Sequence, residues 1–214
     1  MLRFMKYPLA IFDFDGTLAN SLPCSVEILK RLSDQHGFRR IEDHELESLR
    51  TADIKQFLKY LGIPFWKLPQ LVLQVRSAMS EVAHEIPLFP GIVEFLDETT
   101  SAGTELAIVS SNSWENVKTI LGPENVSKFR YTECEASLFG KRPKLRKVLR
   151  QAGVTADQAI YIGDEIRDLQ AAHAEGIAFG AVTWGHTPRD LFRPHYPRDV
   201  FESVESMTNH VLGR

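Results

Sequence analysis

The chain has 214 residues, of which 43% are hydrophobic and 25% charged, the ordinary balance of a globular protein and not that of a disordered chain. Its 25 basic and 28 acidic side chains leave a net charge of −3, too even to favour a nucleic acid or an anionic membrane as partner. Cys24 and Cys134 show no metal-ligand spacing, and a disulfide framework is not expected. No apolar run reaches the roughly 20 residues that span a bilayer, and Asp13 and Asp15 interrupt the apolar N-terminus. We therefore expect a cytoplasmic protein without membrane partners.

Five short apolar runs predict β-strands at 8–13, 105–110, 129–134, 159–163 and 178–183. Several are apolar at nearly every position, which is typical of a parallel sheet buried on both faces. Helix-length segments lie between them, with apolar residues three or four positions apart, as at Ile92, Phe95 and Leu96. Alternating strands and helices predict a Rossmann-like, doubly wound α/β sheet.

The region after the first strand departs from this alternation. It has helix-like segments at 26–32, 54–61 and 71–83, and no convincing strand. Two prolines and a glycine at 87–91 end the helical block and mark a hinge. We therefore predict a catalytic core of residues 1–19 and 87–214 with an inserted all-helical cap domain of residues 20–86.

Polar residues follow three of the predicted strands, at the edge where open parallel sheets bind ligands. Asp13 and Asp15 follow the first strand, and alternation along an extended chain puts them on the same side. Asp164 follows the fourth strand, and Asp168 lies one helical turn further on. The second strand ends in hydroxyl and amide donors, Ser110, Ser111 and Asn112.

This set of groups indicates phosphoryl transfer. Carboxylate oxygens select Mg²⁺, which is usually completed by substrate phosphate. An Asp carboxylate can accept the phosphoryl group, and positive charge is needed on the phosphoryl oxygens. Either Lys141 or Lys144 could supply that charge. The seven histidines, His186 and His195 among them, show no metal-ligand spacing and are expected to be structural or exposed.

The motifs resemble those of the haloacid dehalogenase-like hydrolase superfamily. The stretch 13–18 (DFDGTL) is similar to its first motif, Ser110 after an apolar strand to its second, Lys141 to its third, and 163–168 (GDEIRD) to its fourth. The helical insertion resembles that superfamily's small cap. The stretch 182–185 (VTWG) and the turn at 153–154 resemble the phosphoglycolate-phosphatase-like branch.

The resemblance implies a role for each matched residue. Asp13 would be the nucleophile, and Asp15 would protonate the leaving oxygen and then deprotonate the attacking water. Mg²⁺ would be held by Asp13, Asp164 and the backbone carbonyl of Asp15. Asp168 would orient metal-bound water or Lys141. Substrate phosphate and its ester would be bound by Ser110, Ser111, Asn112, Lys141 and the cap residue Arg50.

The resulting prediction is an Mg²⁺-dependent phosphatase of a small phosphorylated metabolite, acting through an aspartyl-phosphate. Phosphoglycolate is the best single substrate, by branch resemblance. A sugar-phosphate mutase of the β-phosphoglucomutase type and a non-catalytic binding protein on the same fold are the alternatives. A dehalogenase is disfavoured because that chemistry lacks the second aspartate of the first motif, whereas this chain has Asp15 at that position. Both a monomer and a homodimer remain compatible with the sequence.

Overall fold

The computed structural model of the protein describes residues 6–49, 54–135 and 140–214. The chain divides into two compact units, residues 1–20 with 87–214, and residues 21–86. Asn20 belongs to the first unit, one residue beyond the end of the core segment predicted from the sequence. Its backbone N–H donates to the carbonyl of Pro87 (2.9 Å), which ties the two segments of this unit together.

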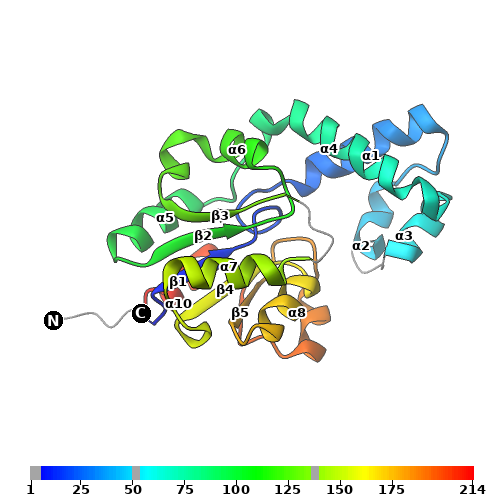
Figure 1. Ribbon diagram of the computed structural model, residues 1–214. Coiled ribbons are helices and arrows are strands. Elements are labelled where there is room, and N and C mark those ends of the chain that lie inside the picture. The colour runs from blue at the N-terminus through cyan, green and yellow to red at the C-terminus, as the bar shows by residue number, and fades with distance from the viewer. Residues whose placement is uncertain (1–5, 50–53, 136–139) are drawn as a thin grey trace. The chain divides into compact units, whose positions relative to one another are not determined.

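In the described part of the chain, the first unit contains a six-stranded sheet in which every neighbouring pair is parallel (Figure 1). The strand order is β3-β2-β1-β4-β5-β6, so the chain moves outward in one direction from β1 and then in the other from β4. This is the doubly wound Rossmann order, and the predicted fold class is confirmed. The strands are β1 (Leu9–Phe12), β2 (Glu105–Val109), β3 (Phe129–Glu133), β4 (Ala159–Gly163), β5 (Ala178–Val182) and β6 (Asp199–Phe201).

The sixth strand, β6, has no counterpart in the sequence prediction. It is three residues long and pairs with β5 through Gly180 opposite Asp199 and Val182 opposite Phe201. Only Phe201 of the three is buried, so the strand carries no apolar run that a sequence pattern could reveal. A Cβ at Gly180 would lie 2.5 Å from a ring carbon of Phe201, so the glycine makes room for the ring.

Side chains alternate between the two faces of the sheet and build a core on each. Tyr161 and Phe179 belong to the cluster that packs with α7 (Arg142–Ala152), α8 (Ile166–Ala174) and α9 (Arg189–Phe192). Phe12 points to the opposite face, where its ring meets Phe95 of α5 edge to face, with centroids 5.5 Å apart. The helix α5 (Ile92–Ser101) in turn contacts α10 (Val204–Val211). Helices therefore cover both faces, as the continuously apolar strands predict.

The remaining helix of the first unit is α6 (Trp114–Val126), whose N-cap Ser113 accepts a hydrogen bond from the backbone of Asn116 (3.2 Å). The described residues of the second unit form α1 (Leu22–His36), α2 (Leu46–Leu49), α3 (Ile54–Leu61), α4 (Leu68–Glu81) and short 3₁₀ turns. Among the residues described, none of the helices is long and apolar enough to cross a bilayer.

Candidate active site

The carboxyl ends of β1 and β4 lie side by side, since the register pairs Phe12 with Ile162. These are the two strands at which the winding direction reverses, the point where open α/β sheets bind their ligands. The chain leaves β1 through Asp13 and leaves β4 through Asp164. Asp13 is anchored there by its backbone N–H, which donates to the carbonyl of Ile162 (2.9 Å).

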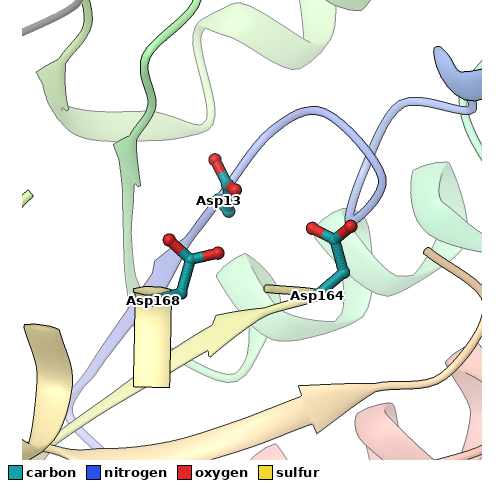
Figure 2. A group of neighbouring side chains, drawn as sticks. All are labelled: Asp13, Asp164 and Asp168. Carbon is teal, nitrogen blue, oxygen red and sulfur yellow. The ribbon is translucent and has the colours of Figure 1, made fainter. Parts of the chain in front are cut away.

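Three buried carboxylates gather at this edge. Asp13, Asp164 and Asp168 each offer an oxygen, and these oxygens all lie within 4.8 Å of one another (Figure 2). Asp168 comes from the first turn of α8, which begins directly after the loop that carries Asp164. The set includes the two side chains expected from the sequence to hold the metal, those of Asp13 and Asp164, and adds Asp168. The third expected ligand was the backbone carbonyl of Asp15.

Lys141 joins two of these carboxylates. Its Nζ lies 2.6 Å from Asp13 and 2.7 Å from Asp168, and the lysine is 8% exposed at the N-cap position of α7. Burial works against its charge, but Asp13 and Asp168 outweigh it and raise the pKa of Lys141. The ammonium therefore stays charged between the two acids.

Lys144, the other candidate amine, has a different set of partners. Its Nζ donates to the backbone carbonyls of Ser110 (2.7 Å), Cys134 (2.8 Å) and Glu135. Lys144 therefore connects the segment that follows β2 to the segment that follows β3. Only Lys141 of the two contacts carboxylates of the cluster, because the side chain at the helix start faces the sheet edge.

Burial dominates the electrostatics of Asp13 and Asp168. It raises the pKa of Asp13, against the opposing effect of Lys141, and it raises the pKa of Asp168 to about 7. The second oxygen of Asp168, Oδ2, is buried and has no hydrogen-bond partner among the described residues. Lys141 contacts two of the three buried acids, so the cluster carries more negative charge than this lysine compensates.

A divalent cation fits this excess of negative charge. The donors are all carboxylate oxygens, the ligand type that Mg²⁺ prefers. An added cation would favour the charged forms of Asp13 and Asp168, which burial disfavours. The residues present are therefore compatible with the metal that the sequence predicts.

Asp15 and the residues that follow β2 form a second part of the site. Asn112 Nδ2 donates to Asp15 Oδ2 (3.0 Å), and Asn112 Oδ1 accepts from Ser113 N (2.8 Å) and Asn116 Nδ2 (3.1 Å). Asn112 thus orients the carboxylate of Asp15. Ser110 is 1% exposed and its Oγ accepts the backbone N–H of Asn112 (3.0 Å).

Two further candidates from the sequence are Ser111 and Arg50. Ser111 is half-buried in the same loop. Arg50 lies outside the described residues.

Two contributors were not identified from the sequence. The hydroxyl of buried Tyr161 lies within hydrogen-bond distance of Asp168 Oδ1 (3.2 Å) and of the Val109 carbonyl (3.3 Å). His186, in the loop after β5, contacts Asp164 Oδ2 through its backbone N–H and through ring Nδ1, each at 2.7 Å. His186 lies four residues beyond Val182, the last residue of β5, so the strand end itself gave no signal for this contact.

A parallel doubly wound sheet with acidic residues and a lysine at its switch point defines the class of doubly wound α/β proteins with a ligand site at that edge. Comparison with known proteins identifies the family within that class. The family described as haloacid dehalogenase-like hydrolase matches residues 10–182. The chain therefore belongs to the haloacid dehalogenase-like hydrolases, in their phosphoglycolate-phosphatase-like branch, and is a phosphoric monoester hydrolase of that family.

Curated relatives cover nearly the whole chain. A phosphoglycolate phosphatase of Synechococcus elongatus is 31% identical over 202 residues, which are 94% of this chain and 95% of the relative. One from Xanthomonas campestris is 28% identical over 200 residues, 85% of this chain and 86% of the relative.

Solved structures share the fold. A haloacid dehalogenase-like hydrolase from Streptococcus pneumoniae superposes with a TM-score of 0.83 at 19% identity, covering 96% of this chain and 98% of its own. CbbY from Rhodobacter sphaeroides, solved in complex with phosphate, superposes with a TM-score of 0.71 at 21% identity, covering 92% of this chain and 94% of its own. At these identities the likeness concerns the fold alone.

Proposed function

We propose that this protein hydrolyses a small phosphate monoester through an aspartyl-phosphate formed on Asp13. The observation that carries the proposal is the buried ion pair between Asp13 and Lys141 at the end of β1, beside Asp164. A carboxylate nucleophile needs its charge at the moment of attack, and a lysine at 2.6 Å favours the charged form.

Asp15 is the proposed acid and base. It donates a proton to the leaving oxygen as the phosphoryl group moves to Asp13, and then takes a proton from the water that attacks the aspartyl-phosphate. Its bond from Asn112 supports this role, since a general acid works only when it is held in place. Lys141 and the donors of 110–112 bind the phosphoryl oxygens, where negative charge must be stabilised.

We assign Mg²⁺ to the side chains of Asp13 and Asp164 and the backbone carbonyl of Asp15. When bound, the cation neutralises phosphoryl charge and aligns the phosphate with the nucleophile. Asp168 is assigned to holding Lys141, since its Oδ1 lies 2.7 Å from the ammonium.

We further propose that residues 21–86 act as a cap that excludes water and selects the substrate, with Arg50 as a cap residue for substrate binding. A helical insertion directly after the first strand is where such an element is connected to the catalytic residues. Water exclusion strengthens every charge interaction in the site.

Phosphoglycolate is the proposed substrate. The relative in Synechococcus elongatus, which matches almost end to end, carries that activity in its name, as does the one in Xanthomonas campestris. A short ester with two anionic groups, a phosphate and a carboxylate, also suits a site in which lysine and a divalent cation supply the positive charge.

The test is phosphate release from a panel of small phosphate esters, with Mg²⁺ and with excess chelator. We expect metal-dependent release, fastest with phosphoglycolate, and no turnover by a folded Asp13→Asn variant. Release that persists in both chelator and the variant would overturn the mechanism. A different preferred ester would replace the substrate and leave the reaction class intact.

A further inference from the structure

The loop after β5 contacts Asp164 through three groups of His186 and Thr187. The backbone N–H of His186 and its ring Nδ1 both lie 2.7 Å from Asp164 Oδ2. The backbone N–H of Thr187 donates to the carbonyl of Asp164 (3.2 Å). From the other side, Thr17 Oγ1 donates to Asp164 Oδ1 (2.9 Å). The carboxylate is therefore fixed by residues from two loops distant in sequence.

Two glycines show how closely these loops approach. A Cβ at Gly185 would lie 2.3 Å from Asp164 Cβ and 2.4 Å from the carbonyl oxygen of Gly16. A Cβ at Gly16 would lie 2.2 Å from Asp164 Oδ2 and 2.4 Å from His186 Nδ1. Real Cβ atoms essentially never lie so close, and Gly16 also has a φ of +74° that favours glycine. The contact between His186 and Asp164 therefore requires glycine at positions 16 and 185, because a side chain at either position would clash with it.

The contacts divide the acceptor capacity of Asp164 unevenly. A carboxylate has about four lone-pair sites, two on each oxygen. Oδ2 accepts from two groups of His186, which fills it, whereas Oδ1 accepts only from Thr17 among the described residues. The remaining capacity for a ligand lies on Oδ1.

We propose that His186 is a positioning residue that occupies Oδ2 of Asp164 and so presents Oδ1 to the divalent cation. This inference rests on the proposed function, which gives Asp164 to the cation. The ring acts through Asp164 and needs no contact with the substrate. Groups that orient metal ligands in this way typically contribute 10- to 100-fold to metal affinity.

The test compares two substitutions of His186 by titration calorimetry of Mg²⁺ into the metal-free protein. In His186→Asn the side-chain amide nitrogen is one bond from Cγ, as Nδ1 is in histidine, so a donor is kept. In His186→Leu that donor is removed. Both variants keep the backbone N–H. His173→Leu, an exposed histidine of α8, is the matched control. We expect the Mg²⁺ dissociation constant to rise about 10- to 100-fold in His186→Leu. It should rise less than about fivefold in His186→Asn and not at all in the control.

Two further readouts separate positioning from a purely structural role. At saturating Mg²⁺ the kcat of His186→Leu should return to within a few-fold of the wild type, because every proposed catalytic group remains. The unfolding temperature in chelator reports stability without the metal, and a structural role would lower it while leaving the dissociation constant unchanged.

Mg²⁺ binding by His186→Leu at wild-type affinity would overturn the inference and leave the proposed phosphatase untouched. Equal losses in the Asn and Leu variants would also overturn it, because the donor would then not matter. A wild-type protein that releases phosphate without binding Mg²⁺ would overturn both the inference and the proposed metal.

Discussion

Replacing Lys141 by methionine removes a cation that lies between two buried acids. Its Nζ lies 2.6 Å from Asp13 and 2.7 Å from Asp168, and the side chain is 7% exposed. Methionine keeps most of the side-chain length and removes the charge. Asp13 and Asp168 then remain buried close to each other, with no ammonium between them.

The magnitude follows from burial. Removing one partner of a buried ion pair typically costs about 3–5 kcal/mol, because it leaves an uncompensated charge. For a chain of this length that lowers the unfolding temperature by about 10 °C. Loss of charge at the phosphoryl oxygens should lower kcat by about 100- to 1,000-fold.

The loss of stability should also depend on pH. Burial raises the pKa of Asp168 to about 7 in the wild type, and the pKa rises further once Lys141 is gone. Below pH 7 both proteins hold the proton on Asp168. Above pH 7 the wild type releases this proton and the variant keeps it. The difference in unfolding free energy between the wild type and Lys141→Met, measured in chelator, should therefore be greater at pH 8 than at pH 6.

The assay is urea unfolding in chelator at pH 6 and pH 8, together with steady-state kinetics at saturating Mg²⁺. Lys147→Met is the control, because Lys147 lies on the same helix and its ion pair with Glu133 is half exposed, which makes it worth at most about 1 kcal/mol. Lys141→Met with wild-type stability and kcat would refute the reasoning.

Three further substitutions test other parts of the structure. Lys144→Met should lower the unfolding free energy by about 2 kcal/mol, measured by urea unfolding, while keeping at least about a tenth of kcat, because its partners are backbone carbonyls. A loss of activity matching that of a Lys141 variant would contradict this. Asn112→Ala should lower kcat about 10- to 100-fold in steady-state assays, since it removes the hydrogen bond from Asn112 Nδ2 to Asp15 Oδ2; unchanged kcat would show that Asp15 needs no such support. Gly180→Ala should cost about 1–3 kcal/mol in thermal unfolding, because its Cβ would lie 2.5 Å from the ring of Phe201, and should leave the activity of the folded protein unchanged. Wild-type stability there would mean that the ring moves freely.

The parallel sheet was predictable because strands buried on both faces appear as continuous apolar runs. The short strand β6 was not, because two of its three residues are not buried. It forms through pairing with β5 and through the space that Gly180 leaves for Phe201, both of which are long-range effects. Local pattern therefore predicted five strands, the edge strand β3 among them, and missed the edge strand β6.

The candidate site divides in the same way. Asp13 and Asp164 were found because acids at strand ends interrupt an apolar pattern, and Asp168 because it lies one helical turn beyond Asp164. The residues alone left Lys141 and Lys144 open, and only the family resemblance favoured Lys141. Both lie near the start of one helix, and the packing of α7 decides which amine meets the acids. His186 was missed because a single histidine carries no spacing signal, and its contact with Asp164 spans 22 residues.

The central claim is that the phosphoryl group is transferred to Asp13, and trapping that intermediate tests it most directly. Enzyme quenched in acid during turnover of phosphoglycolate and then reduced with borohydride should carry homoserine at residue 13, read by peptide mass spectrometry. No reduction product should form without substrate or in Asp13→Asn. Homoserine at position 15, or steady phosphate release with no modified aspartate, would contradict the account.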